Sequence, residues 1–351
     1  MGAPLKSAAI CGIIQSNQMK AVRDMESRGS SRVKGVIMVV LASMCYGITP
    51  ILSNTALKGG LPADFLTRVL GSAPKSMLLD AGNAMPNESV VGFGMAIACA
   101  LSLLTCLIGK RSLRVTKRQA LEMAAYGGGG FTLTMLLISY AYLCIPAGMT
   151  IVLNFTYPIL VALISFLVFK EKLRPASLLA LAVAIVGVAL ISGISGGSAG
   201  PKPALGIPLA LLSGLAYAIY FLAGRHASYR TVDTSVANVW ITGSAAALCF
   251  SIALISGRFR LPPTGFLWLV LLSSGILGYM IGLRLLLGGI RILGSSSASA
   301  LNMLEPAFAC LTSFIVFGEP MGLLKLIGTA LVLIGALISI LAMGKKPAPV
   351  S

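Results

Sequence analysis

Apolar stretches of about 20 residues recur along most of the chain, and short polar segments separate them. About 20 residues is the length that an α-helix needs to cross a hydrocarbon core about 30 Å thick. Because lipid offers the backbone no hydrogen-bond partner, each stretch satisfies its own N–H and C=O groups as a helix. The pattern therefore predicts an all-α membrane protein with ten transmembrane helices. We expect them at 36–57, 88–108, 121–143, 147–169, 176–193, 205–223, 235–255, 265–287, 295–317 and 323–343.

The composition agrees with a membrane-embedded chain. Of the 351 residues, 57% are hydrophobic and 11% are charged, whereas a soluble domain carries about 25% charged residues. The apolar runs are continuous, which argues against the alternating pattern of a transmembrane β-barrel. The formal net charge is +17, but the basic residues lie between the spans rather than on one folded face. This distribution argues against a nucleic-acid partner and leaves the lipid bilayer as the expected environment.

The distribution of Lys and Arg predicts the orientation. With the N-terminus in the cytoplasm, 20 of the 27 Lys and Arg residues fall in cytoplasmic segments and 7 fall outside. Positive residues concentrate on the cytoplasmic side of membrane proteins. We therefore expect a multi-pass protein of the plasma (inner) membrane with both termini in the cytoplasm. Residues 1–33 are polar and basic, so we expect a disordered cytoplasmic tail, with Met25 as an alternative start, and residues 344–351 form a second tail.

The chain repeats itself with an offset of 148 residues. The stretch "LNFTYPILVALISFLVFKEKL" at 153–173 returns as "LNMLEPAFACLTSFIVFGEPM" at 301–321, with nine of 21 positions identical. A weaker match relates "VLASMCYGI" at 40–48 to "LLSGLAYAI" at 211–219. We expect two five-helix repeats at 34–193 and 205–343, joined by a linker at 194–204. Because five is odd, the halves cross the membrane in opposite senses, which is the inverted-topology repeat of many secondary transporters.

Several of these residues resemble a known family. Pro158 and Glu171 frame the end of the fourth span, and "LEP" at 304–306, "FGE" at 317–319 and "IGTALVLIGAL" at 327–337 mark the last two spans. They resemble the ten-helix EamA-type branch of the drug/metabolite transporter (DMT) superfamily. The resemblance covers about 36–343 and is weak at 58–110. It implies a secondary transporter that exports a small metabolite, such as an amino acid, an amine or a drug-like compound, by alternating access.

Three other functions compete with this interpretation. A nucleotide-sugar or sugar-phosphate carrier of the same superfamily would favour paired Lys or Arg deep in the spans, and the sequence places none there. A membrane enzyme would need paired acids or a His, Cys or metal set at one depth. A non-transporting scaffold would leave the inverted repeat without a purpose. The sequence contains no nucleotide-binding, metal-binding or catalytic motif, so we expect no enzyme, no cofactor and no metal.

Glu305 is the main candidate for function, because it alone among the ten acidic residues falls near the middle of a predicted span. A charge at that depth costs at least ~2.5 kcal/mol and marks a functional site by default. It would bind a cationic substrate or exchange a coupling proton, and the alternative is a hydrogen bond that pins helices together. Asn302 and Ser299 share its helix face. Further candidates to line a cavity are Asn154, Tyr157, Tyr46 and Tyr217.

The remaining candidates are structural. Pro158 and Pro306 each free the backbone carbonyl four residues earlier, so each is a possible hinge. Glu171 and Glu319 end their spans, where we expect them to cap or pair with a neighbour. Small residues permit close approach of membrane helices, and we expect packing sites at Gly127, Gly130, Gly275 and Gly278.

Overall fold

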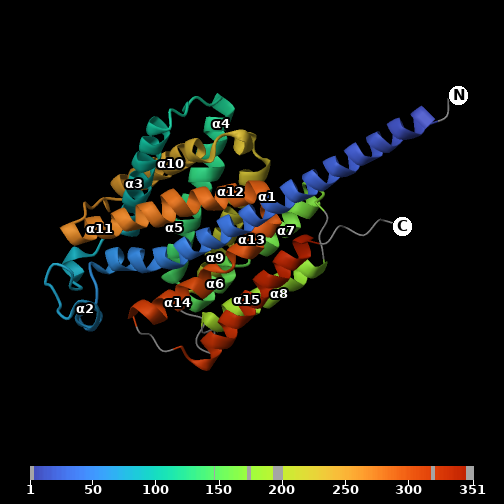
Figure 1. Cartoon of the computed structure of the whole chain (residues 1–351). Helices are drawn as coiled ribbons and strands as arrows, with labels where there is room; N and C mark the ends of the chain where they lie inside the picture. The colour runs from blue at the N-terminus through green and yellow to red at the C-terminus, as the bar shows by residue number, and fades with distance from the viewer. Residues whose placement is uncertain (1–3, 146, 172–174, 193–200, 318–320, 345–351) are drawn as a thin grey trace.

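The computed structural model describes residues 4–145, 147–171, 175–192, 201–317 and 321–344, with most side chains described from Ser30 onward. These ranges are almost entirely helical (Figure 1). One isolated β-bridge, Leu61 with Leu78, is their only extended pairing. The helices are α1 (Pro4–Lys58), α2 (Ala63–Leu70), α3 (Asn87–Ile108), α4 (Lys117–Glu122), α5 (Gly130–Tyr142), α6 (Ala147–Asn154), α7 (Tyr157–Leu167), α8 (Pro175–Ile191), α9 (Pro203–His226), α10 (Thr234–Ile255), α11 (Gly265–Ser274), α12 (Leu283–Leu293), α13 (Ser295–Asn302), α14 (Glu305–Phe317) and α15 (Leu323–Gly344).

The described residues confirm an all-helical membrane protein with several spans. Eight helical stretches are long and apolar enough to cross a membrane. They are Ser30–Lys58, Asn87–Ile108, Lys117–Ala141, Met149–Leu167, Pro203–His226, Thr234–Ile255, Gly265–Leu293 and Leu323–Ala342. Two of the ten predicted spans are not among them. The apolar helix α8 has 17 residues, and the span predicted at 295–317 is divided between α13 and α14, so the number ten stays a prediction.

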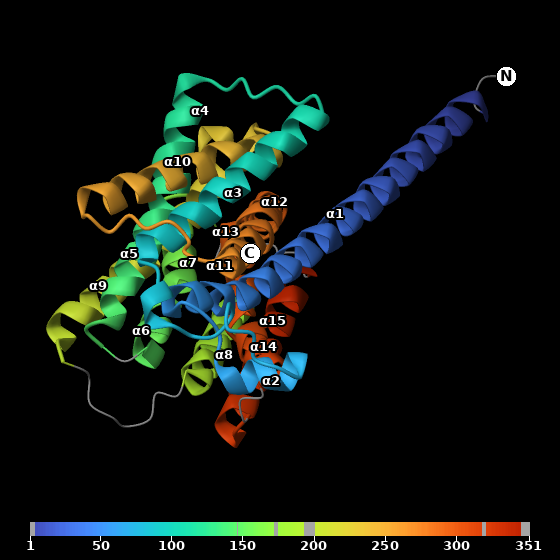
Figure 2. The ribbon, with the colours of Figure 1, turned by 90° about the vertical axis from the view of Figure 1, so that its left-hand side faces the viewer.

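The first helix is longer than the sequence pattern suggests. α1 runs without interruption from Pro4 to Lys58, and its N-terminal part projects from the bundle in both ribbon views (Figures 1 and 2). The backbone of residues 4–33 is therefore helical, which differs from the disordered tail expected from its polar composition. Ala, Met, Lys, Arg and Gln are good helix formers, so polar character alone does not prevent a helix here.

Two segments of π-helix occur at matching places in the chain. η2 (Met123–Gly129) joins α4 to α5, and η4 (Gly275–Gly282) joins α11 to α12. A π-helix has one more residue per hydrogen-bonded turn than an α-helix. Such segments interrupt the regular α-helical hydrogen bonding and often occur at functional sites. Both segments contain glycines that lie against another helix, because a Cβ on Gly127 would be 2.6 Å from Ile241 and one on Gly278 would be 2.6 Å from Thr49.

The helices pack in pairs that repeat across the chain. α3 packs on α10 and α8 packs on α15, while α5 lies against α9 and α12 lies against α1. α8 and α15 lie side by side in Figure 1. Their backbones touch at glycines, since a Cβ on Gly187 would be 2.6 Å from the carbonyl oxygen of Gly328, and one on Gly328 would be 2.7 Å from that of Gly187. Close approach of this kind needs small residues.

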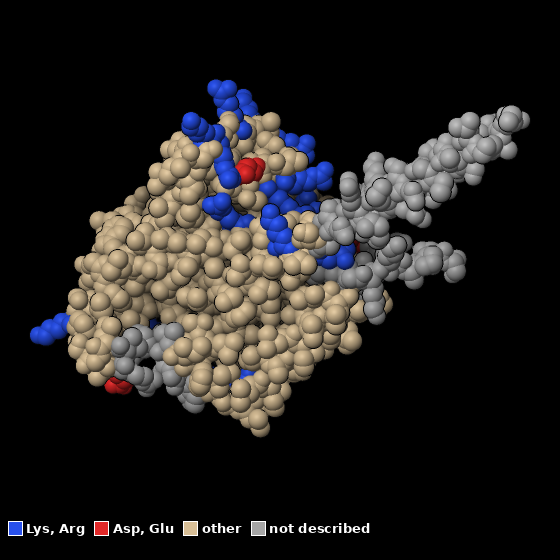
Figure 3. Space-filling view, viewed as in Figure 1, with Lys and Arg blue, Asp and Glu red and all other residues tan. Residues whose placement is uncertain are grey.

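One end of the bundle is rich in Lys and Arg. The blue side chains in Figure 3 gather at the end that carries the α3–α4 connection. There Arg111 forms an ion pair with Asp233 at 2.6 Å, which ties this connection to the start of α10. Burial raises the pKa of Asp233, but hydrogen bonds from the backbone of Ser235 and from Arg111 outweigh that effect, so its pKa lies below the usual value.

Candidate functional site

Two membrane helices are broken at corresponding places in the two copies of the repeat. α6 ends at Asn154 and α13 ends at Asn302, and in each case the next helix begins three residues further along. Pro158 and Pro306 are the second residues of those following helices. Proline fits there because the first turn of a helix has no intrahelical partner for its N–H groups. Each proline therefore stands in the first turn of a new helix after a two-residue turn, and its role as a hinge stays a prediction.

Asn302 organises the polar centre of the second break. It is fully buried, and its amide nitrogen lies 3.2 Å from a carboxylate oxygen of Glu305 and 3.1 Å from the hydroxyl of Tyr157. The amide oxygen of Asn302 lies 3.2 Å from the hydroxyl oxygen of Ser43. The same hydroxyl oxygen lies 3.0 Å from the carbonyl oxygen of Val39, so its one hydrogen is shared between these two acceptors. The side chain of Asn302 thus connects α13, α14, α7 and α1 through hydrogen bonds.

Tyr157 and Glu305 occupy the same position of the repeat, 148 residues apart, and the structure brings both to the amide of Asn302. Both lie within hydrogen-bond distance of the amide of Asn302. Tyr157 is fully buried, and its hydroxyl lies 3.5 Å from the carbonyl of Ser299. Glu305 itself is half-buried. The acid is therefore held in place beside buried hydrogen-bonding groups.

Three tyrosines lie near this acid. The carboxylate of Glu305 is close enough to interact electrostatically with the phenols of Tyr46, Tyr157 and Tyr217. The ring centroids of Tyr157 and Tyr217 are 4.6 Å apart, and each lies about 5 Å from that of Phe221, at 5.2 and 5.1 Å. The buried hydroxyl of Tyr46 has no hydrogen-bond partner among the described residues. An acid within a group of aromatic rings is suited to an organic cation.

The first break has a simpler set of partners. The amide nitrogen of Asn154 lies 2.8 Å from the hydroxyl of Ser213 on α9. The carbonyl oxygen of Asn154, which Pro158 leaves without its helical donor, faces the backbone of α9. A Cβ on Gly214 would be 2.8 Å from this oxygen. The two asparagines therefore hold equivalent helix ends against the first helix of the opposite half, Asn154 against α9 and Asn302 against α1.

Ser299 contacts the site through its backbone carbonyl, 3.5 Å from the hydroxyl of Tyr157, and not through its side chain. Its hydroxyl donates to the carbonyl of Ser296 at 3.0 Å, within its own helix, instead of to Glu305. Ser43 and Ser213, which form hydrogen bonds with the two asparagines, are not among the site residues that the sequence predicts. A signal for them exists, because both serines lie in the aligned stretches 40–48 and 211–219, a few residues before the matching tyrosines.

The structural candidates lie at helix contacts. A Cβ on Gly275 would be 2.9 Å from the carbonyl oxygen of Gly94. A Cβ on Gly130 would be 3.5 Å from the carbonyl oxygen of Ala216, which is an ordinary van der Waals distance. Glu171 faces His226 on α9 at 3.4 Å. Glu319 lies outside the described residues. Among the described residues, no group of three or more His, Cys, Asp or Glu is arranged to hold a metal ion.

Together the long apolar helices and the broken spans define a multi-pass helical membrane protein. Residues 76–193 and 204–341 both match the model of the EamA-like transporter family. The chain belongs to this family, as its sequence motifs predict.

Named relatives and a solved structure agree with this assignment. An uncharacterized transporter of Clostridium kluyveri is 23% identical over 243 residues, which is 65% of this chain and 75% of that protein. The threonine/homoserine exporter RhtA of Escherichia coli K12 is 26% identical over 258 residues, covering 72% of this chain and 82% of the exporter. A crystal structure with 18% identity matches with a TM-score of 0.71 and covers 88% of this chain and 96% of the other, so the two share a fold.

Proposed function

We propose that the protein is a secondary transporter that exports a small metabolite carrying a protonated amine. In this proposal Glu305 binds the amine and exchanges it for a proton during alternating access. The observation that carries the proposal is the hydrogen-bonded set of Glu305, Asn302 and Tyr157 where the broken helices meet. Acidic residues within membrane helices mark substrate and proton pathways.

The paired contacts support an inverted repeat with halves at 34–193 and 205–343 and a linker at 194–204. The first helix of each half packs on the third span of the other, α1 on α12 and α9 on α5, and the second helices α3 and α10 pack on each other. In inverted-repeat transporters, broken helices at corresponding positions of the two halves mark the substrate site. Movement of one half against the other would then expose Glu305 to each side of the membrane in turn.

The chemistry around Glu305 supports a cationic or zwitterionic substrate. One acid provides one negative charge, and aromatic rings such as those of the nearby Tyr46, Tyr157 and Tyr217 attract an ammonium group. The similarity to a threonine/homoserine exporter supports an amino acid as the first class to test, because amino acids carry an ammonium group at neutral pH.

The basic end of the bundle supports a cytoplasmic location for the α3–α4 connection. In this orientation both termini lie in the cytoplasm, and we propose the plasma (inner) membrane as the location. The positive-inside preference is the physical basis, and the cluster of Lys and Arg in Figure 3 is the observation that supports it.

The proposal is tested with Glu305→Gln. Comparing the metabolites of cells that lack and overproduce the protein identifies the substrate, and transport is then measured in proteoliposomes over a range of pH. Gln preserves the size of the side chain and its hydrogen bond with Asn302, but it cannot release a proton or carry charge. We expect this variant to insert normally and to lose transport. Wild-type transport with unchanged pH dependence would assign Glu305 to packing alone.

Glu88 offers a matched control. It is buried near the start of α3, its carboxylate lies 3.6 Å from Arg258, and it takes no part in the hydrogen-bonded set around Asn302. Glu88→Gln removes one negative charge from the same protein, so transport should continue in this variant. Equal loss in both variants would indicate a general effect of removing a buried acid.

A further inference from the structure

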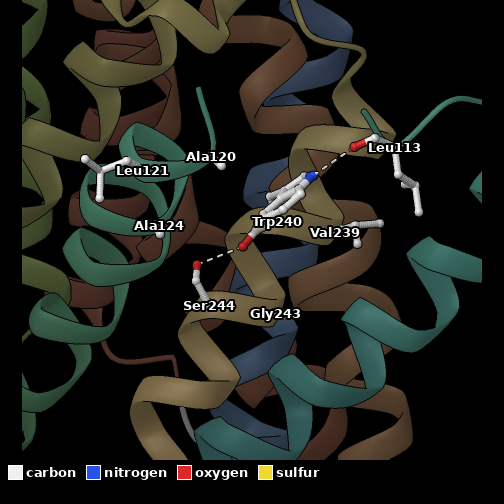
Figure 4. A pocket seen from close by; sticks show the side chains of 8 residues that line it. All are labelled: Leu113, Ala120, Leu121, Ala124, Val239, Trp240, Gly243 and Ser244. Carbon is white, nitrogen blue, oxygen red and sulfur yellow. Dashed lines mark hydrogen bonds between the residues drawn. The ribbon is translucent and has the colours of Figure 1, made fainter. Parts of the chain in front are cut away.

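A groove of about 590 Å³ opens on the outer surface of the bundle between α10 and the α4–η2 helix (Figure 4). Its walls are almost entirely apolar. The indole N–H of Trp240 lies 3.4 Å from the carbonyl of Leu113, and the hydroxyl of Ser244 donates to the carbonyl of Trp240 at 2.8 Å. These polar side-chain atoms are therefore occupied within the protein. Trp240 and Leu121 are 38% and 70% exposed, so the groove lies on the outer surface of a bundle of membrane helices.

The chain segment beside the groove carries uncompensated positive charge. Residues 109–118, which run from the end of α3 into the first turn of α4 and line the groove at Leu113, include five Lys and Arg residues. Two of the five have acidic partners, since Arg111 pairs with Asp233 at 2.6 Å and Arg118 pairs with Glu122 at 2.8 Å. The other three are exposed, and the described part of the chain gives them no ion pair. They are Lys110, Arg114 and Lys117.

We propose that the groove and these three residues bind one anionic phospholipid. An acyl chain lies along Trp240 and Leu121, and the headgroup lies among Lys110, Arg114 and Lys117. The volume of the groove falls within the range of about 300–1,000 Å³ of small-molecule sites, and tryptophan commonly lies at the headgroup level of a membrane. The charge selects the lipid, because a zwitterionic headgroup brings its own cation to a cluster that is already positive.

The expected preference follows from the charge. Each Lys or Arg near an anionic headgroup contributes about fivefold in affinity. Three such residues therefore favour an anionic lipid over a zwitterionic lipid of the same chain length by at least about fivefold, even when screening removes most of the effect. The groove alone does not distinguish the two lipids.

Tryptophan fluorescence tests the proposal, because the chain has two tryptophans. Trp268→Phe leaves Trp240 as the only reporter. The full-length variant is placed in nanodiscs in which either phosphatidylglycerol or phosphatidylcholine carries bromine on its acyl chains, and bromine quenches a neighbouring indole. We expect brominated phosphatidylglycerol to quench Trp240 at a mole fraction at least about fivefold lower than brominated phosphatidylcholine. Changing Lys110, Arg114 and Lys117 to Gln together should remove this preference and leave quenching by phosphatidylcholine unchanged.

Trp268 is the matched control. It is 44% exposed and lies near the start of α11, at the opposite end of the span formed by α10. The arginines before it are engaged, because Arg258 faces Glu88 at 3.6 Å and Arg260 donates to the carbonyl of Ala84 at 2.7 Å. In Trp240→Phe, both lipids should quench Trp268 equally.

Three results would overturn the proposal. Equal quenching of Trp240 by both lipids would show that the groove takes any acyl chain without selection. A preference that persists without the three basic side chains would place its cause elsewhere. Quenching by neither lipid would show that the groove is covered, as it would be by a second copy of the chain.

Discussion

Asn302→Ala tests how much the side-chain amide of Asn302 contributes to the stability of the protein. The substitution removes contacts with Ser43, Tyr157 and Glu305, at 3.2, 3.1 and 3.2 Å. A hydrogen bond between membrane helices contributes about 0.6 kcal/mol on average, whereas one to a charged group contributes about 1.5–3 kcal/mol. The expected loss of unfolding free energy is therefore about 2 kcal/mol if Glu305 is protonated and about 3–4 kcal/mol if it is ionised.

The repeat supplies an internal control for this prediction. Asn154 is the same residue type at the equivalent position and is nearly as buried, with 5% exposure against 0% for Asn302. Its described amide contact is the single one with Ser213. The cost of truncation common to both asparagines cancels in the comparison, so Asn154→Ala should cost about 1–3 kcal/mol less than Asn302→Ala.

Reversible unfolding measures the difference. The purified variants are titrated with sodium dodecyl sulfate in mixed micelles, and the loss of helix is followed by circular dichroism. Repeating the titration across pH separates the protonated from the ionised case, because the cost of Asn302→Ala should rise when Glu305 ionises. The reasoning is refuted if Asn154→Ala destabilises the protein as much as Asn302→Ala at every pH.

Three further outcomes follow from the structure. Gly187→Ala places a Cβ 2.6 Å from a backbone oxygen and should cost about 1–3 kcal/mol in the same titration, whereas Gly265→Ala, with nothing within 4 Å, should change stability by less than about 0.5 kcal/mol. Asp233→Asn should cost less than about 1 kcal/mol at pH 7. Because the pKa of Asp233 is lower in the folded protein than in the unfolded chain, this cost should disappear as the pH falls below about 4, the pKa of Asp in the unfolded chain. A cost that stays constant with pH would exclude the ion pair as its origin. Reporter fusions after Ala199 and Met343 should indicate the outside and the inside of the cell, and matching signals would contradict the inverted repeat.

The positions of most spans can be predicted from the sequence, because a chain that crosses lipid must be apolar and must satisfy its own backbone hydrogen bonds. Eight of the predicted spans coincide with helical stretches of sufficient length, since each must be apolar and continuous. The breaks before Tyr157 and Glu305 follow from prolines that the sequence displays four residues after each asparagine. The helix at residues 4–33 could not be predicted in the same way, because its polar residues carry no hydrophobic signal.

The partners within the site are less predictable. Hydropathy places Asn302 on a helix face, but only tertiary packing decides that it meets Ser43 from the first span. Similarly, the spacing that puts Ser299 on the face of Glu305 does not reveal that its hydroxyl binds a carbonyl of its own helix. Serine can satisfy itself on its own backbone, whereas the longer amide of asparagine cannot do so as easily and reaches across the interface.

The two copies of the repeat differ beside the buried amide of Asn302, where one copy has Tyr157 and the other has Glu305. A carboxylate at both 157 and 305 would place two acids around one buried amide, and like charges at such a distance cannot both ionise. Tyr157 instead gives Asn302 a neutral acceptor at 3.1 Å and an aromatic face beside the single acid. On the proposed function, this asymmetry gives the centre one negative charge, which is neutralised either by one proton or by one ammonium group. Competition between these two occupants for one carboxylate would couple export of the metabolite to entry of the proton.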